Sequence, residues 1–181
     1  MAARAQDEGA ADTGTPPSAE ASTVAEARAA FERGVDAMGK REWRDAVLHF
    51  RRSYALHAHP STLLNLATSL AEGGTLKEAI VFYKRYLHDT RGTDTDPAHR
   101  SAARSAMHML EERLASIRIE FVGTADDDFT LYLDEAVLDD PPDEPIAVDP
   151  GEHTLEARRG DVTAAKTTFR VESAETKTVL L

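Results

Sequence analysis

The stretch WRDAVLHFRRSYAL, residues 43–56, is echoed by LKEAIVFYKRYLHD, residues 76–89. The offset is 33 residues without a gap, and most positions keep their residue type, with alanine at 46 and 79 and an aromatic ring at 50 and 83. In both copies the apolar residues recur at threes and fours, which is the period of a helix with one buried face. The repetition therefore predicts one helical unit that occurs twice and stacks on itself.

The helical period extends well beyond the two copies. Apolar spacing and breaks predict five helices between residues 23 and 116, and the last of them, over 97–116, would close the array. We expect Ser22 or Thr23 to cap the first helix, Ser61 the third and Asp96 the fifth, because their side chains accept bonds from free backbone N–H groups. The sequence HAHP, residues 57–60, should end the second helix before the third begins.

After residue 116 the period changes from helical spacing to alternation. Six short segments alternate apolar and polar residues and are separated by DDPPDEP, DPG and RRGD, which predicts a small antiparallel β-sandwich. Asp149-Pro150-Gly151 is expected to form a type II turn with glycine at a positive φ. The fold class is thus α+β in two domains: a tail over 1–22 without a core, helices over 23–116 and strands over 117–181.

Composition narrows the classes of function. The chain has 181 residues, 41 % of them apolar, no cysteine and a net charge of −11. Without cysteine there are no disulfides, thiolate metal sites or cysteine nucleophiles. Residues 117–181 hold 16 acidic and 6 basic residues, whereas residues 23–116 hold 12 and 14. This balance argues against nucleic acid or an anionic membrane as the main partner, and no apolar run is long enough to cross a bilayer.

The helical part resembles the tetratricopeptide (TPR) repeat. Small residues stand at Gly34 and Ala67, alanine at 46 and 79, and an aromatic residue follows four positions later. The usual TPR repeat has about 34 residues, and here Pro60 arrives about two positions late and one helix takes the place of a third pair. The resemblance implies stacked helical hairpins that curve, with the first helix of each pair on the inner side.

The strand part is similar to the PEGA domain, a small bacterial β-sandwich that is often appended to TPR arrays in envelope and signalling proteins. The segments that carry the likeness are LYLDEAVL, PIAVDPGEHTLEARRGD and the closing ETKTVLL. The Pro-Glu-Gly-Ala motif is replaced by TADDDFT, and the usual Asp-Gly hairpin is Asp134-Glu135 here. The resemblance implies a β-sandwich that acts as a spacer or as a second docking module.

By the TPR resemblance, a groove on the inner side would bind a peptide or a helix. Asn65 occupies the place where peptide-binding TPR proteins hold the backbone of their ligand, although the lysine and asparagine of a carboxylate clamp are absent at Phe31 and Val35. Arg100 and Arg104 could give the groove a positive end. In the alternative interpretation Asn65 bonds a neighbouring helix and the arginines are solvated. The expected groove residues are Arg28, Phe31, Val35, Met38, Leu64, Asn65, Thr68, Arg100 and Arg104.

The search for chemistry predicts no catalytic, cofactor or metal site. His57 and His59 flank a helix break, where an exposed turn is a commoner explanation than a shared metal. The acidic stretches 126–128 and 139–144 lack the spacing of a calcium loop, and solvated loops that protect sheet edges explain them better. There is no phosphate-binding glycine loop and no Gly-x-Ser-x-Gly elbow. We therefore expect a protein that is not an enzyme.

The sequence leaves two functions open. One is an adaptor that binds a protein segment in the helical groove, and the other is a module that binds cell-wall polysaccharide or peptidoglycan through the β-sandwich. Ala3-Arg4-Ala5 has the small-x-small pattern of a signal peptidase site, but no apolar stretch precedes it. A periplasmic or envelope location would follow if a leader was trimmed upstream, and a cytoplasmic one otherwise.

Overall fold

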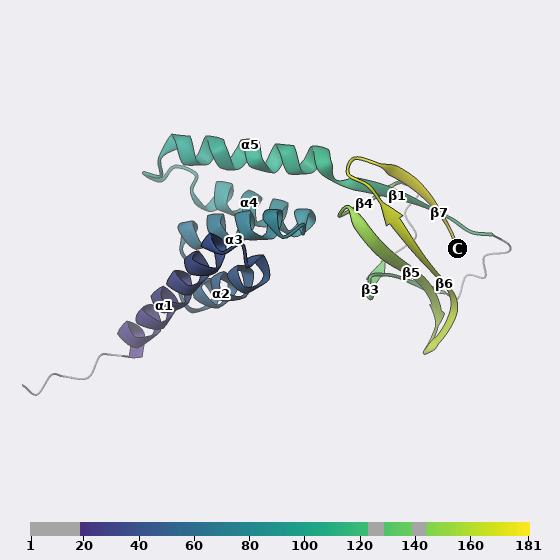
Figure 1. Ribbon diagram of the computed structural model, residues 1–181, viewed down its shortest axis with the longest axis horizontal. Coiled ribbons are helices and arrows are strands. Elements are labelled where there is room, and N and C mark those ends of the chain that lie inside the picture. Colours follow the sequence, from purple (N-terminus) through teal and green to yellow (C-terminus); the bar gives the residue numbers. More distant parts are fainter. Residues whose placement is uncertain (1–18, 123–128, 139–143) are drawn as a thin grey trace, which may run out of the picture.

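The computed structural model describes residues 19–122, 129–138 and 144–181, and it shows an α+β chain in which a helical part precedes a strand part (Figure 1). The predicted fold class is therefore confirmed at this level. Three sequence predictions fall outside the described residues: the pattern at Ala3–Ala5, most of the coreless tail, and the acidic stretches 126–128 and 139–143.

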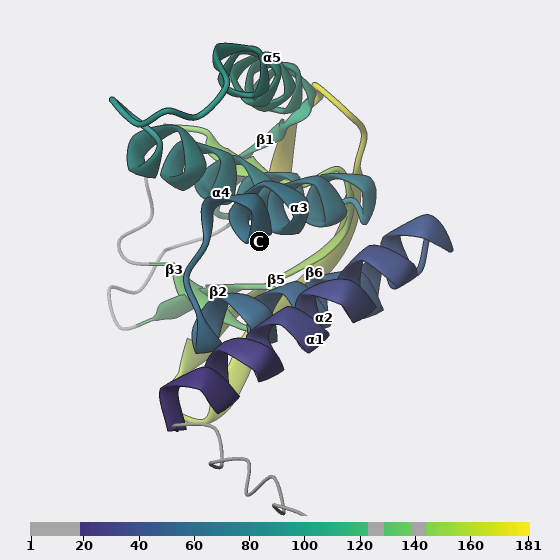
Figure 2. The ribbon, with the colours of Figure 1, turned by 90° about the vertical axis from the view of Figure 1, so that its left-hand side faces the viewer.

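Five helices make up the described helical part. They are α1 (Ala19–Gly39), α2 (Trp43–Leu56), α3 (Pro60–Glu72), α4 (Leu76–Asp89) and α5 (Pro97–Arg113). Each packs against the next in chain order, and Figure 2 shows α5 at one end of the stack with α1 and α2 at the other. Residues 33 positions apart share their burial, since Ala46 and Ala79 are both fully buried and Phe50 and Tyr83 are both in the core.

The helix ends follow the predicted caps only in part. The first helix begins at Ala19, so Ser22 and Thr23 lie inside it, and Thr23 Oγ1 donates back to the carbonyl of Ala19 at 3.0 Å. The prediction that one of them caps the helix was wrong, because polar residues in a first turn are compatible with helix as well as with a cap. Asp96 does cap α5, and its Oδ1 accepts from the N–H of Ala98 at 2.8 Å.

Helices α1 and α2 approach each other closely at Gly34. A Cβ atom on Gly34 would lie 2.6 Å from the ring of Phe50, a distance that real Cβ contacts do not show. Phe31 packs edge-on against the same ring, with centroids 5.5 Å apart and planes at 63°. The missing side chain at position 34 thus lets the Phe50 ring fill the space between the two helices.

The strand part forms two sheets in the described residues. The strands are β1 (Ala115–Glu120), β2 (Thr130–Leu133), β3 (Ala136–Leu138), β4 (Ile146–Val148), β5 (Gly151–Arg159), β6 (Val162–Val171) and β7 (Thr176–Leu180). One sheet has the order β4-β1-β7 and the other the order β3-β2-β5-β6. Their core includes Ile117, Leu155, Val171 and Val179.

The smaller sheet is mixed, whereas the sequence predicted antiparallel strands throughout. The described residues hold seven strands, one more than the six predicted, and the additional strand is β3 of the larger sheet. β7 runs parallel to β1, with Ile117 opposite Lys177. The reason is the loop before β7, which returns to the end of α5: the N–H of Ala174 donates to the carbonyl of Arg113 at 3.2 Å. Because β1 leaves α5 at the same place, both strands start at one end and run in the same direction.

Two turns carry unusual backbone angles. Asp134 and Glu135 have φ angles of 50° and 70°, in the region that favours glycine. They connect β2 to β3 where the PEGA resemblance places Asp-Gly. Gly151 has the positive φ that was expected of it, but its angle of 147° is far from the value of about 80° in a type II turn.

The strand part is tied to the helices at two further points. Ser173 Oγ donates to the carbonyl of Arg113 at 3.1 Å, next to the α5–β1 connection. Asp149 Oδ1 accepts from the N–H of Lys77 at 2.7 Å, in the first turn of α4. Thr75, the residue at the cap position of α4, makes no side-chain cap bond of its own within the described residues, so the turn before β5 supplies that cap.

Candidate functional site

Two cavities lie on either side of α3. The first, which we name the α1–α3 cavity, has a volume of about 230 Å³, and the second, the α3–α5 cavity, about 250 Å³. The α1–α3 cavity is lined by Val24, Ala27, Arg28, Phe31, Ser53, His57, His59, Ser61 and Thr62. The α3–α5 cavity is lined by Leu64, Asn65, Thr68, Tyr83, His99, Ala102, Ala103 and Ala106.

The α3–α5 cavity brings together the three groove residues that were predicted on α3. Thr68 Oγ1 donates to the carbonyl of Leu64 at 2.9 Å and lies 3.1 Å from the hydroxyl of Tyr83. Burial raises the pKa of Tyr83, which keeps the phenol protonated and able to donate to Thr68. The side-chain amide of Asn65, by contrast, has no hydrogen-bond partner among the described residues, although it lines the cavity. Both its donors and its acceptor are therefore free for a ligand.

The four predicted residues on α1 do not form one surface. Arg28 and Phe31 line the α1–α3 cavity, and Arg28 Nε also donates to Glu32 at 3.0 Å. Val35 is 47 % exposed and lines neither cavity, and Met38 packs against the helical core. Of the four predicted residues on α1, only Arg28 and Phe31 thus line a cavity.

The arginines of α5 lie in a different place from the one expected. Arg100 donates to the carbonyl of Leu87 at 3.0 Å and to the hydroxyl of Thr90, so its guanidinium binds the C-terminal end of α4. Arg104, one turn later, is on the same face of the helix as Arg100 and is exposed. The α3–α5 cavity is lined instead by the face of α5 that bears His99. The small residues Ala102, Ala103 and Ala106 therefore line it where positive charge was predicted.

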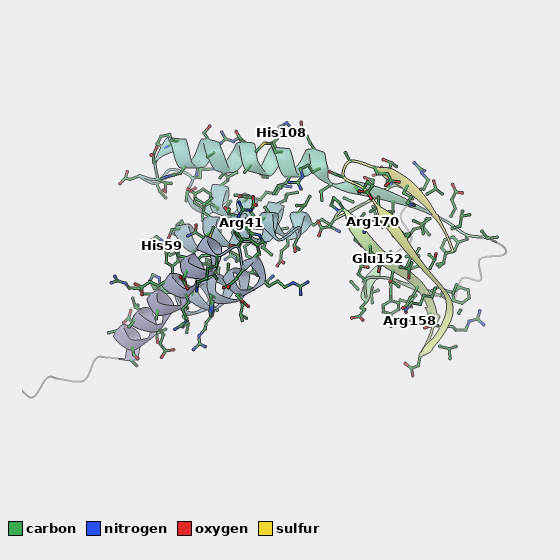
Figure 3. All side chains as sticks on the ribbon, viewed as in Figure 1. Arg41, His59, His108, Glu152, Arg158 and Arg170 are labelled. Atoms are coloured by element: carbon green, nitrogen blue, oxygen red, sulfur yellow. The ribbon has the colours of Figure 1, made fainter. Side chains whose placement is uncertain are left out.

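The start of α3 corrects another prediction. His59, not Ser61, occupies the cap position, and its Nδ1 accepts from the N–H of Ser61 at 3.2 Å. Pro60 follows at the first helical position, where a missing N–H costs nothing. His59 is labelled on the helical part in Figure 3. No group of three or more His, Cys, Asp or Glu side chains that could hold a metal occurs among the described residues.

Sequence reasoning missed several of the residues that line these cavities. Ser53 and His57, from the end of α2, close the α1–α3 cavity, and Thr62 forms part of its floor. Helical periodicity places Ser53 on the buried face, and a polar residue there was a usable signal. His99 was missed because its neighbours on α5 are alanines, which suit a core face and a groove face equally well.

The face of the larger sheet that bears the buried Glu156 carries a network of charged residues. Glu156 Oε1 lies 2.8 Å from Lys166 Nζ, and its Oε2 accepts from Arg158 Nε at 2.7 Å. The bond from Lys166, followed by that from Arg158, lowers the pKa of Glu156. The guanidinium of Arg158, which is labelled in Figure 3, also lies 4.2 Å from the ring centroid of Tyr132.

The aromatic faces of the strand part are partly covered as a result. The guanidinium of Arg158 lies over Tyr132, and that of Arg159 lies 4.8 Å from the ring centroid of Phe129. His153 on β5 is buried, with its Nδ1 2.6 Å from Asp134 Oδ2 and its Nε2 2.6 Å from the carbonyl of Asp149. These contacts give His153 a role in holding two turns together.

Comparison of the chain with family models, curated proteins and solved structures gave no match. Within the described residues, no helix combines the length and the apolar content that a membrane span requires.

Proposed function

We propose that this chain is a non-enzymatic adaptor of the TPR type, which binds an extended segment of a partner protein across α3. The observation that carries the proposal is the free amide of Asn65 in an otherwise largely apolar cavity. An extended peptide presents backbone N–H and C=O groups that need partners, and an asparagine side chain offers both a donor and an acceptor. We name the surface formed by the two cavities and the exposed side of α3 between them the α3 groove.

The size of the two cavities supports a peptide over a small metabolite. Volumes of about 230 and 250 Å³ are below the range of about 300–1,000 Å³ that is usual for pockets that enclose a whole small ligand. They suit single side chains of a chain that lies across α3, with Asn65 in the wall of the second cavity. Ser61 and Asn65 stand one helical turn apart on α3, so one segment can reach both cavities.

In this proposal the PEGA-like strand part is a fixed extension of the helical part. The cap from Asp149 to Lys77 and the bonds at Arg113 join it to both α4 and α5, so it does not hang from a single connection. It would present its acidic surface to a second partner or to the cell envelope. The arginines over Tyr132 and Phe129 reduce the aromatic area that a sugar would need for stacking, which favours the α3 groove as the binding site.

Site-specific photocrosslinking in an extract of the native cell tests the proposal. A photoreactive phenylalanine replaces His99, an exposed residue that lines the α3–α5 cavity, in one bait and Leu48, which is 62 % exposed on α2, in the control bait. We expect a discrete adduct at position 99 that is absent at position 48. A second pair of baits, wild type and Asn65→Ala, should differ in capture of the same partner. The proposal would be abandoned if both crosslinking positions gave the same adducts and N65A captured that partner as well as wild type.

A further inference from the structure

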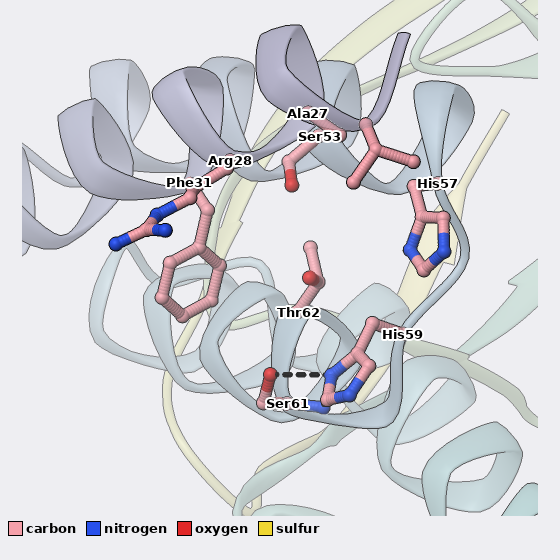
Figure 4. A pocket seen from close by; sticks show the side chains of 9 residues that line it. Ala27, Arg28, Phe31, Ser53, His57, His59, Ser61 and Thr62 are labelled. Carbon is pink, nitrogen blue, oxygen red and sulfur yellow. Dashed lines mark hydrogen bonds between the residues drawn. The ribbon is translucent and has the colours of Figure 1, made fainter. Parts of the chain in front are cut away.

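Two buried residues of the α1–α3 cavity carry hydroxyl groups without partners. Because every fully buried side-chain nitrogen or oxygen atom among the described residues is hydrogen-bonded, these two hydroxyls are accessible from the cavity. Ser53 on α2 and Thr62 on α3 are each only 2 % exposed, and both line the cavity. Neither hydroxyl has a hydrogen-bond partner among the described residues. Figure 4 shows the two side chains on opposite sides of the open space, with the Ser53 oxygen directed into it.

The hydroxyl groups of two other buried residues, Ser69 and Thr90, are hydrogen-bonded. Ser69 donates to the carbonyl of Asn65 at 2.8 Å, and Thr90 donates to the carbonyl of Tyr86 at 2.7 Å. Such a bond to the carbonyl four residues earlier is the ordinary way for a helical hydroxyl to be satisfied. The Ser53 hydroxyl does not make this bond. A polar group that enters the cavity can therefore form a hydrogen bond with Ser53 that the free protein lacks.

The walls around the hydroxyls restrict the occupant. Val24, Ala27 and Phe31 form an apolar side on α1, and His57 stands across the opening (Figure 4). The occupant therefore needs an apolar body with a hydrogen-bonding tip. A tyrosine side chain has both, because its ring can pack against Phe31 and its phenol can donate and accept.

The rim of the cavity favours negative charge next to that side chain. Arg28 lies on the rim, and His59 uses Nδ1 to accept from Ser61, which leaves the proton on its Nε2. None of the described residues that line the cavity is acidic, although Glu32 pairs with Arg28 from the next turn. An anionic group at the rim would meet donors and no lining carboxylate.

We propose that the α1–α3 cavity is a subsite for a tyrosine side chain of the partner segment, with a carboxylate of that segment beside it at the rim. This inference rests on the proposed function, because it names the residue that the partner places at the α1 end of the α3 groove. Ser53 and Thr62 bind the phenol, Phe31 and Val24 pack against the ring, and Arg28 pairs with the carboxylate.

The test uses the full chain and three small probes: N-acetyl-tyrosinamide, N-acetyl-phenylalaninamide and N-acetyl-tyrosine. Binding is followed by NMR through the methyl signals of Val24 and Ala27. Phenol bonds to the two hydroxyls should make tyrosinamide bind about fivefold tighter than phenylalaninamide. N-acetyl-tyrosine, with its free carboxylate, should bind tighter still, and this gain should shrink as salt is added.

Matched variants separate the hydroxyls from the shape of the cavity. Ser53→Ala with Thr62→Val removes both hydroxyls at nearly constant volume. In this double variant tyrosinamide and phenylalaninamide should bind about equally well. Ser105→Ala removes an exposed hydroxyl on α5 and should leave the preference unchanged. Far-UV circular dichroism and the unperturbed methyl spectrum verify that the double variant is folded.

The outcomes distinguish this inference from the proposed function. Equal binding of the two amides to wild type, or no shift of the Val24 and Ala27 signals with any probe, overturns the tyrosine subsite and leaves a cavity filled by water. If the crosslink at position 99 still forms in that case, the α3 groove remains as proposed. A clear tyrosine preference without any adduct at position 99 would instead keep the subsite and reject the groove.

Discussion

The contact between Gly34 and the Phe50 ring gives a quantitative test of how the first helical pair is packed. Phe50 is fully buried, and its replacement by alanine should destabilise the helical part by about 3–5 kcal/mol. A methyl group on Gly34 would lie 2.6–2.9 Å from three ring atoms. Overpacking of this kind costs about 1–3 kcal/mol, against which alanine regains about 1 kcal/mol of helix propensity over glycine. Gly34→Ala should therefore be destabilising by up to about 2 kcal/mol.

The effect of Gly34→Ala should change sign when the ring is removed. In the Phe50→Ala background the methyl group meets a cavity in place of the ring, so the helix propensity gain of about 1 kcal/mol remains without the steric cost. Gly39→Ala is the matched control, because no described atom lies within 4 Å of the added Cβ. Gly39→Ala should change the free energy of unfolding by the same amount in the wild-type and Phe50→Ala backgrounds.

The assay is urea unfolding followed by the fluorescence of Trp43, the single tryptophan of the chain, which lies at the start of α2. This probe reports on the helical part without requiring the whole chain to unfold in one step. Additive free energies for Gly34→Ala and Phe50→Ala would refute the reasoning, because they would mean that the ring and the methyl group never compete for the same space.

Three further predictions follow from single contacts. Tyr83→Phe should cost about 1 kcal/mol in urea unfolding through the lost bond to Thr68; because the folded pKa of Tyr83 is raised, wild type should also lose stability as the pH rises above the value of an ordinary tyrosine, and the phenylalanine variant should lose less. Since the pKa of Glu156 is lowered in the folded protein, its contribution is present above the ordinary pKa of glutamate and fades as the pH falls through the lowered value; thermal melts of Glu156→Gln should show a weaker decline on acidification, and equal slopes would contradict the network with Lys166. Asp149→Ala removes the cap on α4 and should cost about 1 kcal/mol, with faster amide exchange in the first turn of α4 as the readout; unchanged exchange there would show that the cap is not formed in solution.

Local pattern decided much of this architecture. The 33-residue echo predicted that Ala46 and Ala79 would occupy equivalent buried positions, and they do, because a helix with a fixed apolar face must bury that face whatever covers it. Alternation after residue 116 predicted strands, and Asp96 was recognisable as a cap, because both features depend on neighbours within a few residues in the chain. Asn65, Leu64 and Thr68 were placed together for the same reason: they share one helix face.

The tertiary structure alone decided which surfaces meet. Periodicity shows that a face is buried but not which element buries it, so the engagement of Arg100 with the end of α4 could not be read from α5. The parallel pairing of β7 with β1 depends on a loop that returns to Arg113, and the cap of α4 by Asp149 joins residues 72 positions apart. The unpaired hydroxyls of Ser53 and Thr62 belong to this group as well. A cavity forms where side chains of separate elements fail to fill the space between them, and that shortfall is a property of the assembled packing, which no single stretch of sequence contains.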